Sequence, residues 1–119
     1  MSDDYIVERV HTKKESEAET FSVNCTPRLD TGELVASVVV AEVGTADLTI
    51  SNEAVSTAAL DIEDEDGNDV EVAIGKAIQY HVTATGTAET TYKIKLTLTT
   101  DSTPARVLIN YVKLRVIAD

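Results

Sequence analysis

The sequence predicts an all-β protein whose single domain is a sandwich of about seven short antiparallel strands. Composition is the first observation, because Val, Ala, Ile and Leu supply most of the 43% hydrophobic residues and sixteen Thr accompany them. β-Branched side chains lose freedom in a helix and fit a pleated, half-buried surface. The second observation is an alternation of apolar and polar residues. The third is a turn signal roughly every 8–12 residues, the spacing typical of a β-sandwich. A chain of 119 residues is long enough for one hydrophobic core.

The first twenty residues, "MSDDYIVERVHTKKESEAET", differ from the rest of the chain. Ile6, Val7 and Val10 form a small apolar group, and the other residues have mixed charge with no sustained period. Such a segment cannot bury enough apolar surface to fold alone. We therefore expect residues 1–20 to form an extended N-terminal arm, either a flexible tail or a segment exchanged between subunits. Residues 21–119 are expected to form the sandwich.

Seven later segments have the length and the alternation of strands. The clearest is "TTYKIKLTLTTD", in which Tyr92, Ile94, Leu96 and Leu98 alternate with lysines and threonines. The apolar set is expected to point inward and the polar set outward. The predicted strands occupy residues 32–44, 46–51, 55–63, 70–74, 76–86, 90–101 and 106–118.

The last of these segments, "RVLINYVKLRVIA", changes its alternation part of the way along. Val107 and Ile109 share one face, whereas the apolar residues from Val112 onward fall on the other face. One extra residue in a strand produces such a change, so a β-bulge near Asn110 is predicted.

The stretch "DIEDEDGNDVEV" (residues 61–72) carries seven acids in its first eleven residues. Alternating aliphatic residues lead into it and out of it. The Asp-Gly pair at its centre tolerates the positive φ of a tight hairpin turn. We interpret the stretch as an exposed hairpin tip on which the acids, Asp64 and Asp66 among them, cluster and repel one another mildly.

A calcium loop is the alternative for the acidic stretch. A loop of the helix–loop–helix type needs acids at positions one, three and five, Gly at six and Glu at twelve. With Gly67 in sixth place, Asp64 and Asp66 fit, but positions one and twelve are Ile62 and Ala73. Neither side chain can bind a cation, and the flanking segments have the pattern of strands. The hairpin is therefore the better interpretation.

Residues suited to catalysis are few and separated in the sequence. His11 falls in the predicted arm, and His81 falls on the outward face of a predicted strand. Cys25 has no partner for an internal disulfide and no nearby base, so it is expected to be a small core residue. Neither a phosphate-binding glycine loop nor a nucleophile or zinc motif is present. The sequence predicts a protein that is not an enzyme and holds no cofactor or metal.

Charge argues against some classes of partner. The formal net charge is −11, whereas nucleic-acid binding needs a concentrated positive surface. The sequence has no signal-peptide pattern and no apolar run near 18 residues, so we expect no secretion by that route and no membrane partner. Residues 1–71 carry 18 acids and four bases, and residues 72–119 carry three acids and six bases. Two copies with such asymmetry can meet through opposite charges, although chance variation between strand faces is an equal alternative.

Three segments in order carry a family resemblance: "RLDTGELVAS" (28–37), "LTISNEAV" (48–55) and "TAETTYKIKLTLTTDS" (87–102). Their succession resembles a family of small virion proteins of tailed bacteriophages with an immunoglobulin-like β-sandwich. In that family a short "L-x-x-GE" turn precedes a Val/Ser-rich strand, and a "G-x-x-x-T-T-Y" loop opens a strand of alternating Thr and aliphatics. Here the turn spans Leu29 to Glu33 with one extra residue, and the loop spans Gly86 to Tyr92. The resemblance covers about residues 20–119; unlike members with a Trp before the turn, this chain has none.

The resemblance implies a structural role in the particle, as a capsid decoration, head–tail or fibre-associated protein. The expected partners are then other virion proteins (capsid, connector or fibre) and further copies of the chain. The protein would be made in the bacterial host cytoplasm and reside in the virion.

Assembly is expected to use the arm and the sheet edges. Lys93 and Lys95 would form a basic patch with Lys113 and Arg115 if their strands are neighbours. This patch would suit an acidic surface such as the tip at Asp64 and Asp66. The candidate assembly residues are therefore Lys93, Lys95, Lys113, Arg115, Asp64, Asp66, Ile6, Val7 and Val10.

A binding module that recognises a host surface glycan or protein is the alternative function. Such sites usually expose aromatic rings in loops. The predicted loops here carry Thr, Ala, Ser and Gly, and Tyr80 and Tyr92 are expected to point inward. This composition favours the structural role.

Overall fold

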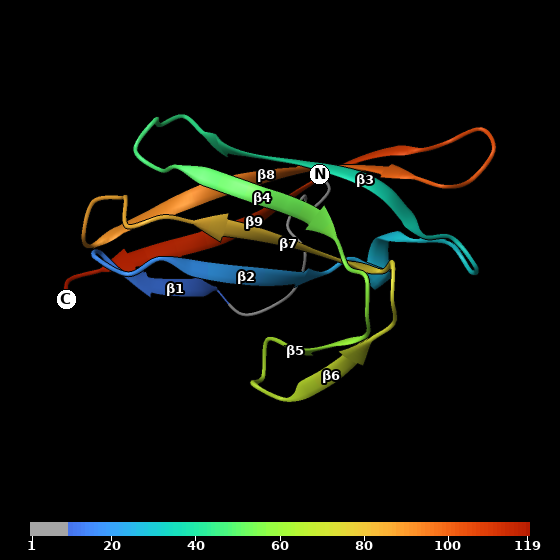
Figure 1. Cartoon of the computed structure of the whole chain (residues 1–119), viewed down its shortest axis with the longest axis horizontal. Coiled ribbons are helices and arrows are strands. Elements are labelled where there is room, and N and C mark those ends of the chain that lie inside the picture. Colours follow the sequence, from blue (N-terminus) through green and yellow to red (C-terminus); the bar gives the residue numbers. More distant parts are fainter. Residues whose placement is uncertain (1–9) are drawn as a thin grey trace.

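The structure, a computed structural model, describes residues 10–119 and folds them into nine strands and one short 3₁₀ helix (Figure 1). The strands are β1 (His11–Lys14), β2 (Glu19–Asn24), β3 (Val35–Val43), β4 (Ile50–Val55), β5 (Leu60–Glu63), β6 (Asp69–Val72), β7 (Ala77–Val82), β8 (Thr90–Thr100) and β9 (Val107–Ile117), and the 3₁₀ helix is Thr26–Arg28. Each of the seven predicted strands overlaps one of β3 to β9. The prediction at 46–51 shares only residues 50–51 with β4, and the prediction at 55–63 shares only residues 60–63 with β5.

Two sheets form the layers of a sandwich, which confirms the predicted all-β class. One sheet has four strands in the order β1-β9-β8-β3, and the other has three in the order β2-β7-β4. The hairpin β5–β6 is a separate two-stranded sheet that lies beside the sandwich, beyond β2 (Figure 1).

The core lies between the inner faces of the two sheets. β7 contributes Ile78, Tyr80 and Val82, each with none of its surface exposed. β8 contributes Ile94 and other apolar residues of the same parity, while the intervening lysines and threonines are half-buried or exposed. The two-residue alternation predicted for both segments is confirmed.

The predicted β-bulge near Asn110 is wrong. β9 pairs with β8 from Val107 to Val116 without a register shift, and its even-numbered residues point into the core. Asn110 is one of them and is only 2% exposed. Its Oδ1 accepts a hydrogen bond of 2.7 Å from Nε of Arg28, and such a partner makes burial of an amide tolerable. Because the buried Asn110 is polar, the sequence pattern suggested that the strand changes face at this residue. Val107 and Ile109 lie on the outer face.

Two strands, β1 and β2, lie in or begin in the segment predicted to be an arm. β1 pairs in parallel with β9, with His11 opposite Leu114, and β2 pairs antiparallel with β7 from Glu19 onward. Residues 11–14 and 19–20 therefore belong to the two sheets of their own chain. Among the arm's predicted contact residues, Ile6 and Val7 lie outside the described residues, and Val10 precedes β1 with 49% of its surface exposed.

The acidic stretch forms the predicted hairpin. The antiparallel pairs of β5 and β6 run from Leu60–Val72 to Glu63–Asp69, and residues 64–68 make the turn. Oδ1 of Asp64 accepts hydrogen bonds of 2.9 Å from the backbone N–H groups of Asp66 and Asn68. The Asp64 carboxylate therefore holds the turn together, a role that needs no cation.

Candidate functional site

The outer face of the four-stranded sheet is the main candidate for an interaction surface. We define this outer face by the outward residues of β3, β8 and β9, which lie in cross-strand rows. One row joins Val39, Thr97 and Ile109, and the next joins Ser37, Thr99 and Val107. Val39 and Val107 are each 62% exposed and Ile109 is 38% exposed. These rows form an apolar end at which aliphatic side chains face solvent.

The opposite end of the outer face is basic. Lys93 lies across from Lys113, Lys95 across from Tyr111, and Thr91 across from Arg115. The strands β8 and β9 are thus neighbours, and their register brings the four predicted basic residues together on one face. The Lys93 ammonium lies 4.1 Å from the centre of the Tyr111 ring, a cation–π contact. Arg115 forms an ion pair of 2.9 Å with Glu89.

One face of the hairpin β5–β6 has the opposite charge. Residues paired across antiparallel strands share a face, and here Asp61 lies opposite Glu71 and Glu63 opposite Asp69. All four side chains are exposed. We call this group the acidic face of the hairpin; Asp64 and Asp66 lie at its tip. Within one chain the hairpin lies beside β2 of the other sheet, so the structure does not join the predicted acidic and basic residues (Figure 1).

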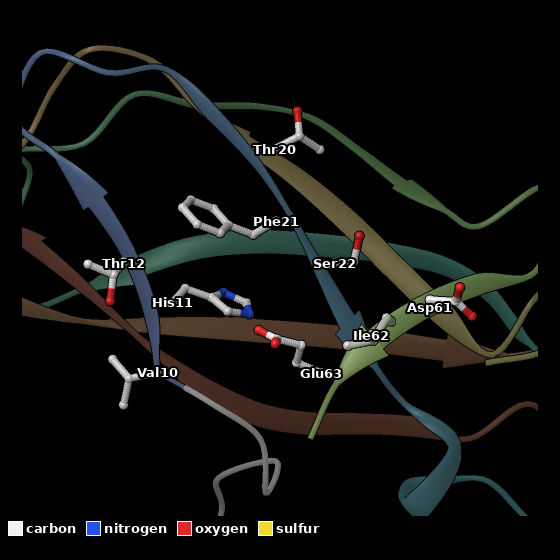
Figure 2. Close-up of a pocket in the computed structure, with 9 residues that line it drawn as sticks. All are labelled: Val10, His11, Thr12, Thr20, Phe21, Ser22, Asp61, Ile62 and Glu63. Carbon is white, nitrogen blue, oxygen red and sulfur yellow. The ribbon is translucent and has the colours of Figure 1, made fainter. Parts of the chain in front are cut away.

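An open groove of about 380 Å³ separates the hairpin from the sandwich (Figure 2). Its walls come from β1, β2 and β5. The His11 ring stacks on Phe21, with centroids 4.9 Å apart, and its Nδ1 lies 2.8 Å from the hydroxyl of Tyr80. Figure 2 shows the Glu63 carboxylate on the opposite wall. The lining residues are Val10, His11, Thr12, Thr20, Phe21, Ser22, Asp61, Ile62 and Glu63.

Among residues 10–119, the carboxyl group with the largest pKa shift is that of Glu33, which lies near the start of β9. Arg106 holds the pKa of Glu33 well below its ordinary value, and the backbone N–H of Asp30 lowers it further. The same ion pair raises the pKa of Arg106. The Glu33 side chain is 4% exposed, and Arg106 also donates to the backbone carbonyl of Arg28 at 3.1 Å. The group joins the loop before β3 to the start of β9, which is a structural role.

Other residues considered for chemistry have structural neighbours. Nδ1 of His81 lies 2.9 Å from Oγ1 of Thr20, and Cys25 is fully buried as predicted. Among residues 10–119, no three His, Cys, Asp or Glu side chains come together in a group able to hold a metal ion. In the same part of the chain, no helix has the length and apolar character needed to span a membrane.

The apolar end of the outer face was not predicted from the sequence. One signal pointed to it: Val38, Val39 and Val40 are consecutive, and in a strand at least one of three consecutive residues must point away from the core. The second signal is that Val107 and Ile109 fall on the face opposite to Val112. The predicted bulge explained this difference by placing both groups of residues on the same face.

Comparisons with protein-family models, with curated proteins and with solved structures found no match for this chain.

Proposed function

We propose that this chain is a non-enzymatic structural component of a tailed-bacteriophage particle, as a capsid decoration or a head–tail or fibre-associated protein. The proposal rests on the three sequence segments described above and on one structural observation. That observation is the outer face of the four-stranded sheet, which carries exposed Val39, Val107 and Ile109 beside a basic end. Large aliphatic residues that gather on a rigid, exposed face are typical of a protein–protein contact surface.

We also propose that the sandwich is of the immunoglobulin type. In that type the second, fifth and fourth strands share one sheet, and the third, sixth and seventh share the other. Here β2, β7 and β4 form one sheet, and β3, β8 and β9 lie together in the other. The hairpin β5–β6 is then an insertion between the fourth and fifth strands of the type, and β1 adds to the edge at β9.

Quantitative mass spectrometry of purified particles tests the proposed role. We expect particles of the phage that encodes this chain to contain it in a fixed ratio to the major capsid protein, through successive gradient purifications. A phage protein that is expressed but not packaged serves as the control. If the chain is abundant in the lysate and absent from the particles, the proposal is wrong.

A binding module for a host glycan or protein is the second candidate, and the groove favours it. Its lining brings carboxylates, hydroxyl groups and a half-buried aromatic ring together, and such groups can bind a sugar. Binding of the purified chain to host cells in the absence of particles would favour this candidate over the structural role.

A further inference from the structure

We propose that the acidic face of the hairpin β5–β6 in one copy docks on the basic end of the outer face in a second copy. This inference rests on the proposed structural function and names the partner of its assembly surface. The contact joins Asp61, Asp69, Glu71 and their neighbours in one copy to Lys93, Lys95, Lys113 and Arg115 in the next.

The two surfaces are complementary in charge. Acids occupy both cross-strand pairs of the acidic face, Asp61–Glu71 and Glu63–Asp69. On the basic end Lys93 faces Lys113. A surface that gathers charges of one sign attracts a surface of the other sign and fixes how the two copies meet.

The two surfaces also match in spacing, because both are antiparallel two-stranded units. Alternate residues on one strand lie about 7 Å apart, and cross-strand partners lie about 5 Å apart. Asp69 and Glu71 therefore have the same separation along β6 as Lys93 and Lys95 have along β8. Several carboxylates can then face several cations at once without any change in either backbone.

The position of the two surfaces determines the kind of assembly. The hairpin lies beside β2, and the outer face belongs to the other sheet (Figure 1). A contact between two different surfaces is head-to-tail, so it produces a closed ring or an open chain of copies. A single contact is expected to be weak, because a hairpin of two four-residue strands presents only roughly 130 Å² of sheet. Closure into a ring or seating on a particle then adds stability through multivalency.

A charge-swap experiment tests the contact with the full-length chain. The face variant is Lys93→Glu with Lys95→Glu, and the hairpin variant is Asp61→Lys with Glu71→Lys. A combined variant carries all four changes. The matched control, Glu19→Lys with Glu53→Lys, makes the same charge change as the hairpin variant at exposed positions of β2 and β4.

Sedimentation velocity at chain concentrations up to about 0.5 mM measures association, because contacts of this size are weak. At about 0.01 M salt, where the Debye length is about 30 Å, the wild type and the matched control should sediment as oligomers. At about 1 M salt, where it is about 3 Å, both should sediment as the 12.8 kDa monomer. The face variant and the hairpin variant should each remain monomeric at low salt. Mixing them, or using the combined variant, should restore oligomers.

The outcomes separate this inference from the proposed function. Circular dichroism first establishes that each variant is folded. A wild type that is monomeric in every condition overturns the inference, and so does a mixture that stays monomeric while the wild type associates. Neither result touches the particle measurement, since a chain that is bound in particles but monomeric in solution keeps the structural role without this contact.

Discussion

Glu33 and Arg106 form an ion pair where the loop before β3 meets the start of β9. Nε of Arg106 lies 3.1 Å from Oε2 of Glu33, and Nη2 contacts the other carboxylate oxygen. The backbone N–H of Asp30 donates to Oε1 of Glu33 at 2.9 Å, and the Asp30 carboxylate lies 3.6 Å from Arg106. A nearly buried carboxylate is tolerated here because each oxygen has a donor.

The Glu33 ion pair predicts an acid-dependent loss of stability. The pKa of Glu33 is below its ordinary value of 4.5 in the folded chain. The stabilisation is therefore fully present above the unfolded pKa and is lost as the pH falls towards the folded pKa. Glu33→Gln should lower the free energy of unfolding near neutral pH, and the difference from the wild type should shrink below about pH 4.5. Urea denaturation across this pH range measures the effect, with exposed Glu53→Gln as the control. A difference that is constant with pH would contradict this account.

At the scale of the element, β1 depends on a buried lysine. Lys13 is 1% exposed, and its Nζ donates to the carbonyl oxygens of Lys14, Glu15 and Glu17 at 3.0, 3.2 and 3.0 Å. These three carbonyls belong to the end of β1 and the turn into β2. The ammonium group thus closes the corner between the two sheets, and all three of its donor positions are used.

Replacement of Lys13 should destabilise this corner. Lys13→Ala leaves three carbonyls without their donor and opens a cavity, so we expect a loss of about 3 kcal/mol in the free energy of unfolding. Lys14→Ala, one residue further along β1 on the exposed side, is the matched control and should change stability by less than about 0.5 kcal/mol. Chemical denaturation followed by circular dichroism measures both variants. Equal effects at the two positions would show that the Lys13 contacts do not stabilise the corner.

The elements show what the sequence could predict and what it could not. β7 and β8 were predictable because their inward residues are all apolar, with Tyr80 and Tyr92 as their largest members. β2 was missed because its inward apolar residues, Phe21 and Val23, make too short an alternation. β1 was missed because its inward positions include the charged Lys13, whose acceptors are backbone atoms that no sequence pattern reveals. Asn110 misled the prediction for the same reason. The alternation of residues along a strand shows only which side chains are polar. Whether a polar side chain is buried depends on whether the fold gives it a hydrogen-bond partner.

The candidate site divides in the same way. Its basic end was predictable because Lys93 and Lys95 alternate with strongly apolar neighbours, and only the adjacency of β8 and β9 had to be supplied by the fold. The acidic face of the hairpin followed from the Asp-Gly turn. The apolar end was not predictable, since an exposed Val107 has the same sequence pattern as a buried one.

For the whole molecule, residues 11–20 connect the beginning of the described chain to its end. The backbone N–H of Glu15 donates to the carbonyl of Ile117 at 2.8 Å. Ser16 donates to both carboxylate oxygens of Asp119, through its backbone N–H at 3.0 Å and its hydroxyl at 2.5 Å, and these bonds lower the pKa of Asp119. β1 also covers one edge of β9. Removal of this segment therefore affects the sandwich itself, and not only an appended arm.

Two truncations separate the sandwich from the predicted arm. Removal of residues 1–9 leaves every described strand intact, so the far-ultraviolet spectrum and the midpoint of thermal unfolding should change little. Removal of residues 1–20 deletes β1 and the first two residues of β2, and should lower the midpoint by about 10 °C or more. The shorter truncation then tests the arm alone: if residues 1–9 are exchanged between subunits, the oligomers measured by sedimentation at low salt should fall to monomers. If the oligomers keep their mass after removal of residues 1–9, the sheet faces assemble without the arm. If the two truncated chains unfold at the same temperature, β1 does not stabilise the four-stranded sheet.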